Sequence, residues 1–297
     1  MAQASDLIDE QAMQRVSKLR LVARTVVQSF ISGAHRSVYK GFSVEFAQHR
    51  MYSRGDEIRH IDWKVFGKSD RLFVKQYEEE TNLRATIVLD ASGSMLYKGG
   101  GAETKFEYAK KLAASLAYLM IGQQDSAGLV TFDTELRSHV PPRSTSSHLS
   151  NVLNVLEATT PQGETNLCPI LHNLSNMLKR RGLVIVISDF FAPVEDLVQA
   201  LGHFHHKRHE VILFQILDPH ELTFPFDNVA EFRSLENSAH KVKLDAPRVR
   251  KLYLERFTKF RERLSEVCHR FHYDHVTLQS DQPYDLALSH YLMSRQK

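Results

Sequence analysis

Apolar runs and amphipathic segments alternate along most of this 297-residue sequence. Short runs rich in β-branched residues predict buried strands at 84–89, 127–132, 183–188, 211–217 and 273–278. Apolar residues spaced three or four positions apart predict helices at 5–32, 103–121, 147–157, 167–179, 194–206, 247–271 and 284–293. Because strands alternate with helices, we expect an α/β fold with a doubly wound, mainly parallel sheet covered by helices on both faces.

Several connecting segments also carry local signals. A further strand is expected at 135–140, joined to the preceding one by a short turn and stopped by Pro141 and Pro142. The three glycines at 99–101 predict a flexible turn and not a phosphate-binding loop, because no Lys followed by Ser or Thr comes after them. Alternating apolar residues predict a short hairpin inserted at about 229–245, just before the longest C-terminal helix.

The segment from Gly33 to Glu80 differs from the rest, because charges of both signs alternate with aromatic residues, among them the single tryptophan, Trp63. This mixture indicates partly buried pairs of arginine and carboxylate rather than a solvated surface, and it suggests Trp63 as a core anchor. We therefore predict two parts, residues 1–83 with the N-terminal helix and this compact segment, and residues 84–297 with the α/β domain. Since no linker rich in Pro, Gly or Ser separates them, we expect one body.

Net charge, the length of apolar runs and cysteine spacing limit the kinds of partner and the cellular compartment that we expect for this protein. Lys and Arg number 38 against 35 for Asp and Glu, so a net charge of +3 gives little attraction to nucleic acid or to anionic lipid. The longest largely apolar run, 112–122, is too short to span a bilayer. The first ten residues include three acidic ones and no uninterrupted apolar segment, so we expect no signal peptide. Cys168 and Cys268 form no Cys-x-x-Cys motif, which fits a reducing compartment. We expect a cytoplasmic protein that binds no nucleic acid.

Oxygen-bearing side chains follow two of the predicted strands. Asp90, Ser92 and Ser94 come directly after the strand at 84–89, Thr165 follows a glycine turn, and Asp189 ends the run at 183–188. In an open α/β sheet, ligands bind beyond the carboxyl ends of the strands, so we expect these side chains to converge there. Mg²⁺ prefers about six oxygen ligands of this kind. For the Asp90 loop alone, a serine-rich turn that caps a helix is the alternative interpretation.

This pattern has a known counterpart. An Asp-x-Ser-x-Ser loop, then a Thr, then an Asp after a later strand, is the order of the metal-ion-dependent adhesion site, so residues 84–297 resemble a von Willebrand factor A domain. The resemblance implies Mg²⁺ or Mn²⁺ held mainly through water by the two carboxylates and directly by the hydroxyls. It also implies one open coordination position, which would take an Asp or Glu from a protein partner. The implied metal ligands are Asp90, Ser92, Ser94, Thr165 and Asp189.

A second, more specific resemblance covers nearly the whole chain. The element Gly-Asp-x-x-Arg-x-Ile-Asp-Trp at 55–63 is similar to the signature of the bacterial domain of unknown function family fifty-eight, which joins it to a von Willebrand factor A-like fold. The structural signature residues are Glu45, Arg50, Asp56, Arg59, Asp62, Trp63 and Arg71. Members of that family are commonly encoded beside MoxR-type AAA ATPases, which implies such an ATPase as partner.

The leading hypothesis is therefore a metal-dependent protein-binding module, not an enzyme. It would act as an adaptor or co-chaperone with a MoxR-type AAA ATPase in the assembly or maturation of other proteins. The chain has no Walker motif of its own. The alternative is a metal-dependent, phosphatase-like hydrolase with Asp90 as nucleophile, although Ser92 stands where such enzymes usually carry a second Asp. A scaffold with an empty site is a third possibility.

Overall fold

The computed structural model describes residues 2–32, 49–52, 63–69, 71–75, 83–237 and 239–295. The chain divides into two compact units, one containing residues 1–36 and 83–297 and the other containing residues 37–82. Among the described residues, no helix combines the length and apolar character that crossing a membrane requires.

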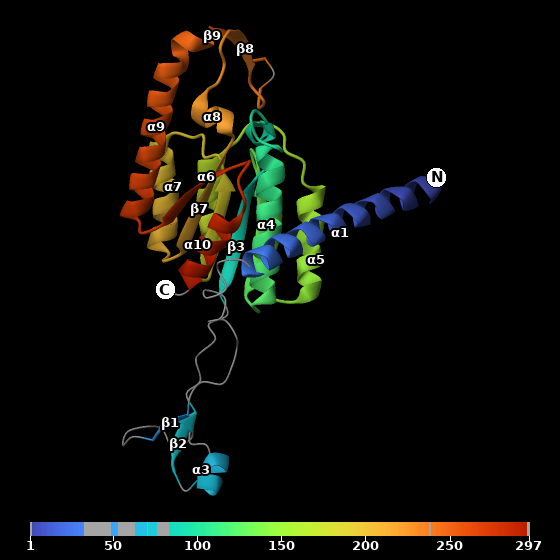
Figure 1. Cartoon of the computed structure of the whole chain (residues 1–297), viewed down its shortest axis with the longest axis vertical. Helices are drawn as coiled ribbons and strands as arrows, with labels where there is room; N and C mark the ends of the chain where they lie inside the picture. Colours follow the sequence, from blue (N-terminus) through green and yellow to red (C-terminus); the bar gives the residue numbers. More distant parts are fainter. Residues whose placement is uncertain are drawn as a thin grey trace. The chain divides into compact units, whose positions relative to one another are not determined.

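A six-stranded sheet forms the centre of the larger unit (Figure 1). Its strands run in the spatial order β10 (Asp274–Gln279), β7 (Glu210–Leu217), β6 (Leu183–Ser188), β3 (Arg84–Asp90), β4 (Ser126–Phe132) and β5 (Leu136–Arg143). All neighbours are parallel except β4 and β5. Since β4 and β5 lie on one side of β3 and the later strands on the other, the order reverses between β3 and β6. That reversal is the switch point at which α/β sheets bind ligands.

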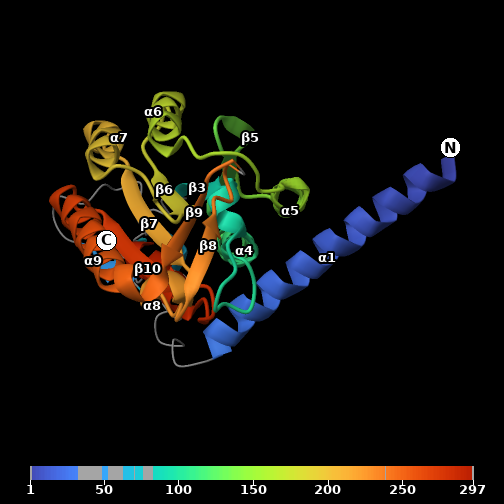
Figure 2. The same ribbon diagram turned by 90° about the horizontal axis from the view of Figure 1, so that it is seen from above.

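Helices cover both faces of this sheet. They are α4 (Lys105–Gly122), α5 (Ser146–Ala158), α6 (Leu167–Met177), α7 (Val194–His206), α9 (Ala246–Arg270) and α10 (Asp285–Arg295). Val88, Val186 and Leu213 belong to a buried apolar cluster with residues of α6, α7 and α9. The helix α4 contacts four strands and lies on the opposite side of the sheet (Figure 2). The predicted α/β architecture with a mainly parallel sheet is confirmed.

The N-terminal helix α1 (Ala2–Ser32) packs on α4 and α5 in the larger unit. Its residues Leu19, Ala23, Val27 and Phe30 are almost completely buried and recur at helical spacing. The helix therefore groups with the sheet, which differs from the expected grouping of α1 with the signature segment in residues 1–83. The physical reason is its apolar stripe, which α4 and α5 cover.

The antiparallel edge strand β5 is longer than expected. Pro141 and Pro142 were expected to stop it, but it continues through both to Arg143. Edge strands tolerate proline because one side of the strand makes no ladder hydrogen bonds. The hairpin expected at about 229–245 is present as β8 (Val229–Arg233) and β9 (Lys241–Asp245), which pair with each other in a two-stranded sheet. A short helix, α8 (Pro219–Thr223), was not predicted.

The described residues of the smaller unit form a two-stranded sheet and one short helix. Strands β1 (His49–Met51) and β2 (Phe73–Lys75) pair antiparallel, and α3 covers Trp63–Ser69. Trp63 is 58% exposed and makes an edge contact with Phe66, so its assignment as a core anchor was wrong. Arg71 is exposed, Arg50 is described only by its backbone, and four signature residues lie outside the described residues, namely Glu45, Asp56, Arg59 and Asp62.

Candidate functional site

The five predicted site residues lie on three loops at the switch point. Asp90 is the last residue of β3, and Ser92 and Ser94 continue into the 3-10 helix η3 (Gly93–Leu96). Thr165 precedes α6, and Asp189 directly follows β6. Two backbone hydrogen bonds join the Asp90 loop to the loop before α6. Gly93 N–H donates to Gly163 O at 2.8 Å, and Gln162 N–H donates to Ala91 O at 2.9 Å.

Asp90 is completely buried and both of its carboxylate oxygens accept hydrogen bonds. The Oδ1 atom accepts from Ser92 N–H at 2.9 Å, and Oδ2 accepts from the Ser188 hydroxyl at 2.6 Å. Ser92 Oγ and Ser94 Oγ lie 3.1 Å apart. Burial, followed by the negative charge of Asp189, raises the pKa of Asp90 to about 7 despite these hydrogen bonds. The ionised form of Asp90 is thus held at a free-energy cost that a nearby cation would offset.

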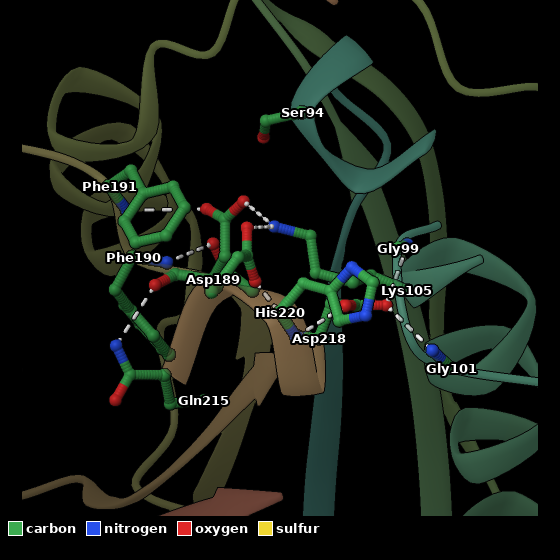
Figure 3. Close-up of polar contacts among 12 residues, drawn as sticks. Ser94, Gly99, Gly101, Lys105, Asp189, Phe190, Phe191, Gln215, Asp218 and His220 are labelled. Carbon is green, nitrogen blue, oxygen red and sulfur yellow. Dashed lines mark hydrogen bonds and ion pairs between the residues drawn. The ribbon is translucent and has the colours of Figure 1, made fainter. Parts of the chain in front are cut away.

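Asp189 is held by a buried lysine that the sequence analysis missed (Figure 3). Lys105 Nζ donates to Asp189 Oδ2 at 2.8 Å and to Glu221 Oε1 at 2.7 Å, and both Lys105 and Asp189 are 1% exposed. Burial alone would lower the pKa of Lys105, but the two carboxylates raise it, so the amine is charged. The other oxygen, Asp189 Oδ1, accepts from Phe191 N–H at 3.2 Å. A lysine in the first turn of a helix opposes the helix dipole, and this was the available signal for an acidic partner.

A further carboxylate, that of Asp218, accepts hydrogen bonds from the glycine turn at residues 99–101. The N–H groups of Gly99, Gly100 and Gly101 donate to Asp218 at 3.0, 2.8 and 3.1 Å, and His220 N–H donates at 2.8 Å (Figure 3). Burial raises the pKa of Asp218, but these donors outweigh it and the pKa lies below its usual range. The expected flexible turn is therefore a backbone cradle, and a carboxylate of this chain occupies it.

The hydroxyl oxygen of Thr165 is buried and has no hydrogen-bond partner among the described residues. Buried polar atoms almost always have a hydrogen-bond partner. Since the Thr165 oxygen has none among the described residues, it is available to bind a ligand. A further acidic residue, Glu236 in the loop between β8 and β9, lies near Asp189, Ser94 and Thr165. The sequence analysis missed Glu236, because nothing in the hairpin pattern indicates that its loop reaches the site.

These donors fit a hard divalent cation. The loops offer two carboxylates and three hydroxyls, and oxygen is the ligand that Mg²⁺ and Mn²⁺ prefer. No cluster of three or more His, Cys, Asp or Glu suited to a metal is found among the described residues, so cation binding here depends on the hydroxyls. The unpartnered Thr165 oxygen and the buried Asp90 carboxylate are both of the chemical type that such a cation binds.

An apolar groove of about 760 Å³ begins beside the site. Phe191, two residues after Asp189, lines it together with Pro193, Phe232, Tyr253, Phe257 and Phe260. Phe191 also faces the Lys105 ammonium at 4.9 Å from the ring centre. Phe191 thus borders both the groove and the candidate site.

Known proteins resemble this chain in sequence and in fold. It is 26% identical over 226 residues to the uncharacterized protein Rv1480 of Mycobacterium tuberculosis (strain ATCC 25618 / H37Rv), a match that covers 74% of this chain and 69% of that protein. The solved structure of the conserved hypothetical protein BatB from Bacteroides thetaiotaomicron aligns with 72% of this chain and 98% of its own, at 16% identity and a TM-score of 0.49. The SpRpn10 VWA domain aligns with 72% of this chain and 95% of its own, at 13% identity and a TM-score of 0.43.

The profile of the family described as "Protein of unknown function DUF58" matches residues 48–263. The resemblance that the signature segment carries is thereby confirmed, and the chain belongs to the DUF58 family.

Proposed function

We propose that this protein is a binding module that captures an acidic side chain of a partner protein through a divalent cation. The observation that carries this proposal is the convergence of three loops at the switch point of the sheet. The proposed cation ligands are Asp90, Ser92, Ser94, Thr165 and Asp189.

The charges at the site support a cation. Two carboxylates, those of Asp90 and Asp189, are buried together, and the ammonium of Lys105 is shared between Asp189 and Glu221. Asp90 therefore lacks a cationic partner of its own among the described residues, and its pKa is raised. When bound, Mg²⁺ or Mn²⁺ would supply the missing positive charge and an open position for a carboxylate oxygen.

The protein's own residues set the geometry of capture. Ser188 and the backbone of Ser92 fix the Asp90 carboxylate, and Lys105 fixes that of Asp189. Because both acids are held by neighbours, they orient before any ligand arrives. Such preorganisation reduces the entropy that binding would otherwise lose.

We propose a MoxR-type AAA ATPase as partner, with the chain serving as an adaptor or co-chaperone in the assembly or maturation of other proteins. Family membership supports this choice through the resemblance described above. The chain would contribute recognition, and the ATPase would contribute nucleotide hydrolysis.

Titration calorimetry with Mn²⁺ tests the metal part of the proposal. The wild-type protein is expected to bind one ion, and Asp90→Asn and Thr165→Ala are expected to weaken binding at least about tenfold, the effect of losing one oxygen ligand worth about 1.4 kcal/mol. Asp227→Asn is the control, since Asp227 is 82% exposed and pairs with Arg250. Asp90→Asn is expected to fold, because a neutral amide avoids the burial of a charge. Equal binding by wild type and Asp90→Asn would refute the assignment.

The partner and the rival function are tested with the same variants. A purified MoxR-type ATPase from the same source should bind immobilised wild type in Mg²⁺ but not in chelator, and should not bind Asp90→Asn. A phosphatase assay with a generic phosphate monoester examines the hydrolase alternative. Turnover in Mg²⁺ that Asp90→Asn abolishes would replace the binding proposal with the enzymatic one.

A further inference from the structure

The tip of the β8–β9 hairpin lies directly on the loops of the candidate site. A Cβ atom added to Gly93 would be only 2.4 Å from the carbonyl oxygen of Leu235, so the tip touches the Asp90 loop at backbone distance. On the other loop, Asn237 Nδ2 donates to Glu164 Oε1 at 3.2 Å. Figures 1 and 2 show the hairpin at the end of the sheet where β3 and α4 meet. The tip therefore contacts two of the three loops of the site.

Between these contacts, the Glu236 carboxylate turns inward. It lies beside the Ser94 side chain, the backbone N–H of Thr165 and the Asp189 carboxylate. The preceding residue, Leu235, is 46% exposed, whereas Glu236 is partly buried. An acidic residue is thus placed against other acids while its apolar neighbour faces solvent, the reverse of what burial alone favours.

The tip is ordered by its own turn but is not part of the main sheet. Ser234 Oγ accepts from Glu236 N–H at 3.3 Å and from Asn237 N–H at 3.1 Å. At the end of β8 next to the tip, Phe232 stacks on Phe224 with ring centres 5.6 Å apart. Strands β8 and β9 form a separate two-stranded sheet, and such sheets are marginal without further support. Beyond Phe232, the tip is therefore held by its own turn and by its contacts with the site loops, not by the ladder of the main sheet.

We infer that Glu236 is an internal ligand of the candidate site, occupying the position that a partner's carboxylate would take. This inference rests on the proposed function. The tip would then compete with the partner as a tethered ligand, whose effective concentration is on the order of millimolar. The partner's binding segment would resemble the tip, with a glutamate exposed on a short turn. Binding of the partner requires displacement of the hairpin tip.

Glu236→Gln tests the inference, since it keeps the shape of the side chain and removes its charge. Glu231→Gln is the matched control on the same hairpin, because Glu231 is exposed and pairs with Arg233. The probe is Mn²⁺, followed by titration calorimetry and by hydrogen exchange of residues 232–240. We expect Mn²⁺ to slow exchange in the tip of wild type and of Glu231→Gln but not of Glu236→Gln, whose affinity for Mn²⁺ should fall about tenfold through loss of one ligand.

A synthetic peptide copied from residues 232–240 then measures the competition. In Mn²⁺ it should bind the Glu236→Gln protein at least about tenfold more tightly than wild type, because the internal competitor is gone. The same peptide with Gln in place of the glutamate should not bind. The inference would be overturned if wild type and Glu236→Gln bound the peptide equally, or if Mn²⁺ slowed hydrogen exchange in the tip equally in both proteins. Either result would leave the metal site intact. Failure of wild type to bind Mn²⁺ at all would overturn the proposed function and this inference together.

Discussion

The ammonium nitrogen of Lys105 lies 2.8 Å from Asp189 Oδ2, and both side chains are 1% exposed. This ion pair joins the first residue of α4 to the loop after β6, and Glu221 extends it to α8. The contact thus holds α4, α8 and the loop after β6 together at the carboxyl ends of the central strands, where the candidate site lies.

Lys105→Met is expected to destabilise the protein by about 3–5 kcal/mol, because it leaves Asp189 and Glu221 buried without a cation. Urea unfolding followed by circular dichroism measures the change. Lys111→Met on the same helix is the control, since the Lys111 pair with Glu103 is partly exposed and such pairs contribute about 1 kcal/mol or less. Equal losses in the two variants would show that the Lys105 pair has no special structural role.

Asp218→Ala is expected to cost about 2–4 kcal/mol, because four backbone N–H groups lose a charged acceptor. Thermal unfolding gives the size of the loss, and faster hydrogen exchange at residues 99–101 locates it. Asp227→Ala, which removes an exposed carboxylate, should change stability by about 1 kcal/mol or less. Unchanged exchange in the glycine turn would contradict the cradle assignment.

Two glycines should respond to alanine in opposite directions. A Cβ atom at Gly182 would meet Arg84 O at 2.4 Å, which forces strand backbones apart, so Gly182→Ala should destabilise by about 1–3 kcal/mol. At Gly122, the last residue of α4, no atom lies within 4 Å of the added Cβ. Gly122→Ala should therefore stabilise by up to about 1 kcal/mol through helix propensity. Chemical unfolding of both variants checks the sign of each change.

His275 on β10 should make the protein less stable in mild acid. Burial, aided by the charge of Arg261, lowers its pKa from 6.5 to about 4. Above pH 6.5 both the folded and the unfolded chain hold it neutral. Between pH 6.5 and 4 only the unfolded chain takes up the proton, so the free energy of unfolding falls by up to about 3 kcal/mol. Urea unfolding at several pH values measures this fall. The free energy of unfolding of wild type, minus that of His275→Phe, should decrease by the same amount over this pH range. A difference that does not vary with pH would refute the assignment.

The sequence predicted the sheet well because its strands are continuous apolar runs buried on both faces, as at Leu183–Ser188. It also placed Asp90 and Asp189 correctly at strand ends, since that position follows from the strands themselves. Lys105 and Glu236 were missed because they reach the site from α4 and from the hairpin, through tertiary packing that no local pattern encodes. Trp63 was misassigned because residue type alone does not determine burial, and this side chain is 58% exposed.

The strand β5 forms one edge of the six-stranded sheet. A free sheet edge offers unpaired N–H and C=O groups on which a foreign strand can add, the usual beginning of edge-to-edge aggregation. Pro141 and Pro142 lie near the end of β5 and provide no N–H donors. Replacing them with residues that do would give this edge a more complete row of donors. The tandem prolines therefore make this end of the edge a poorer template for a foreign strand.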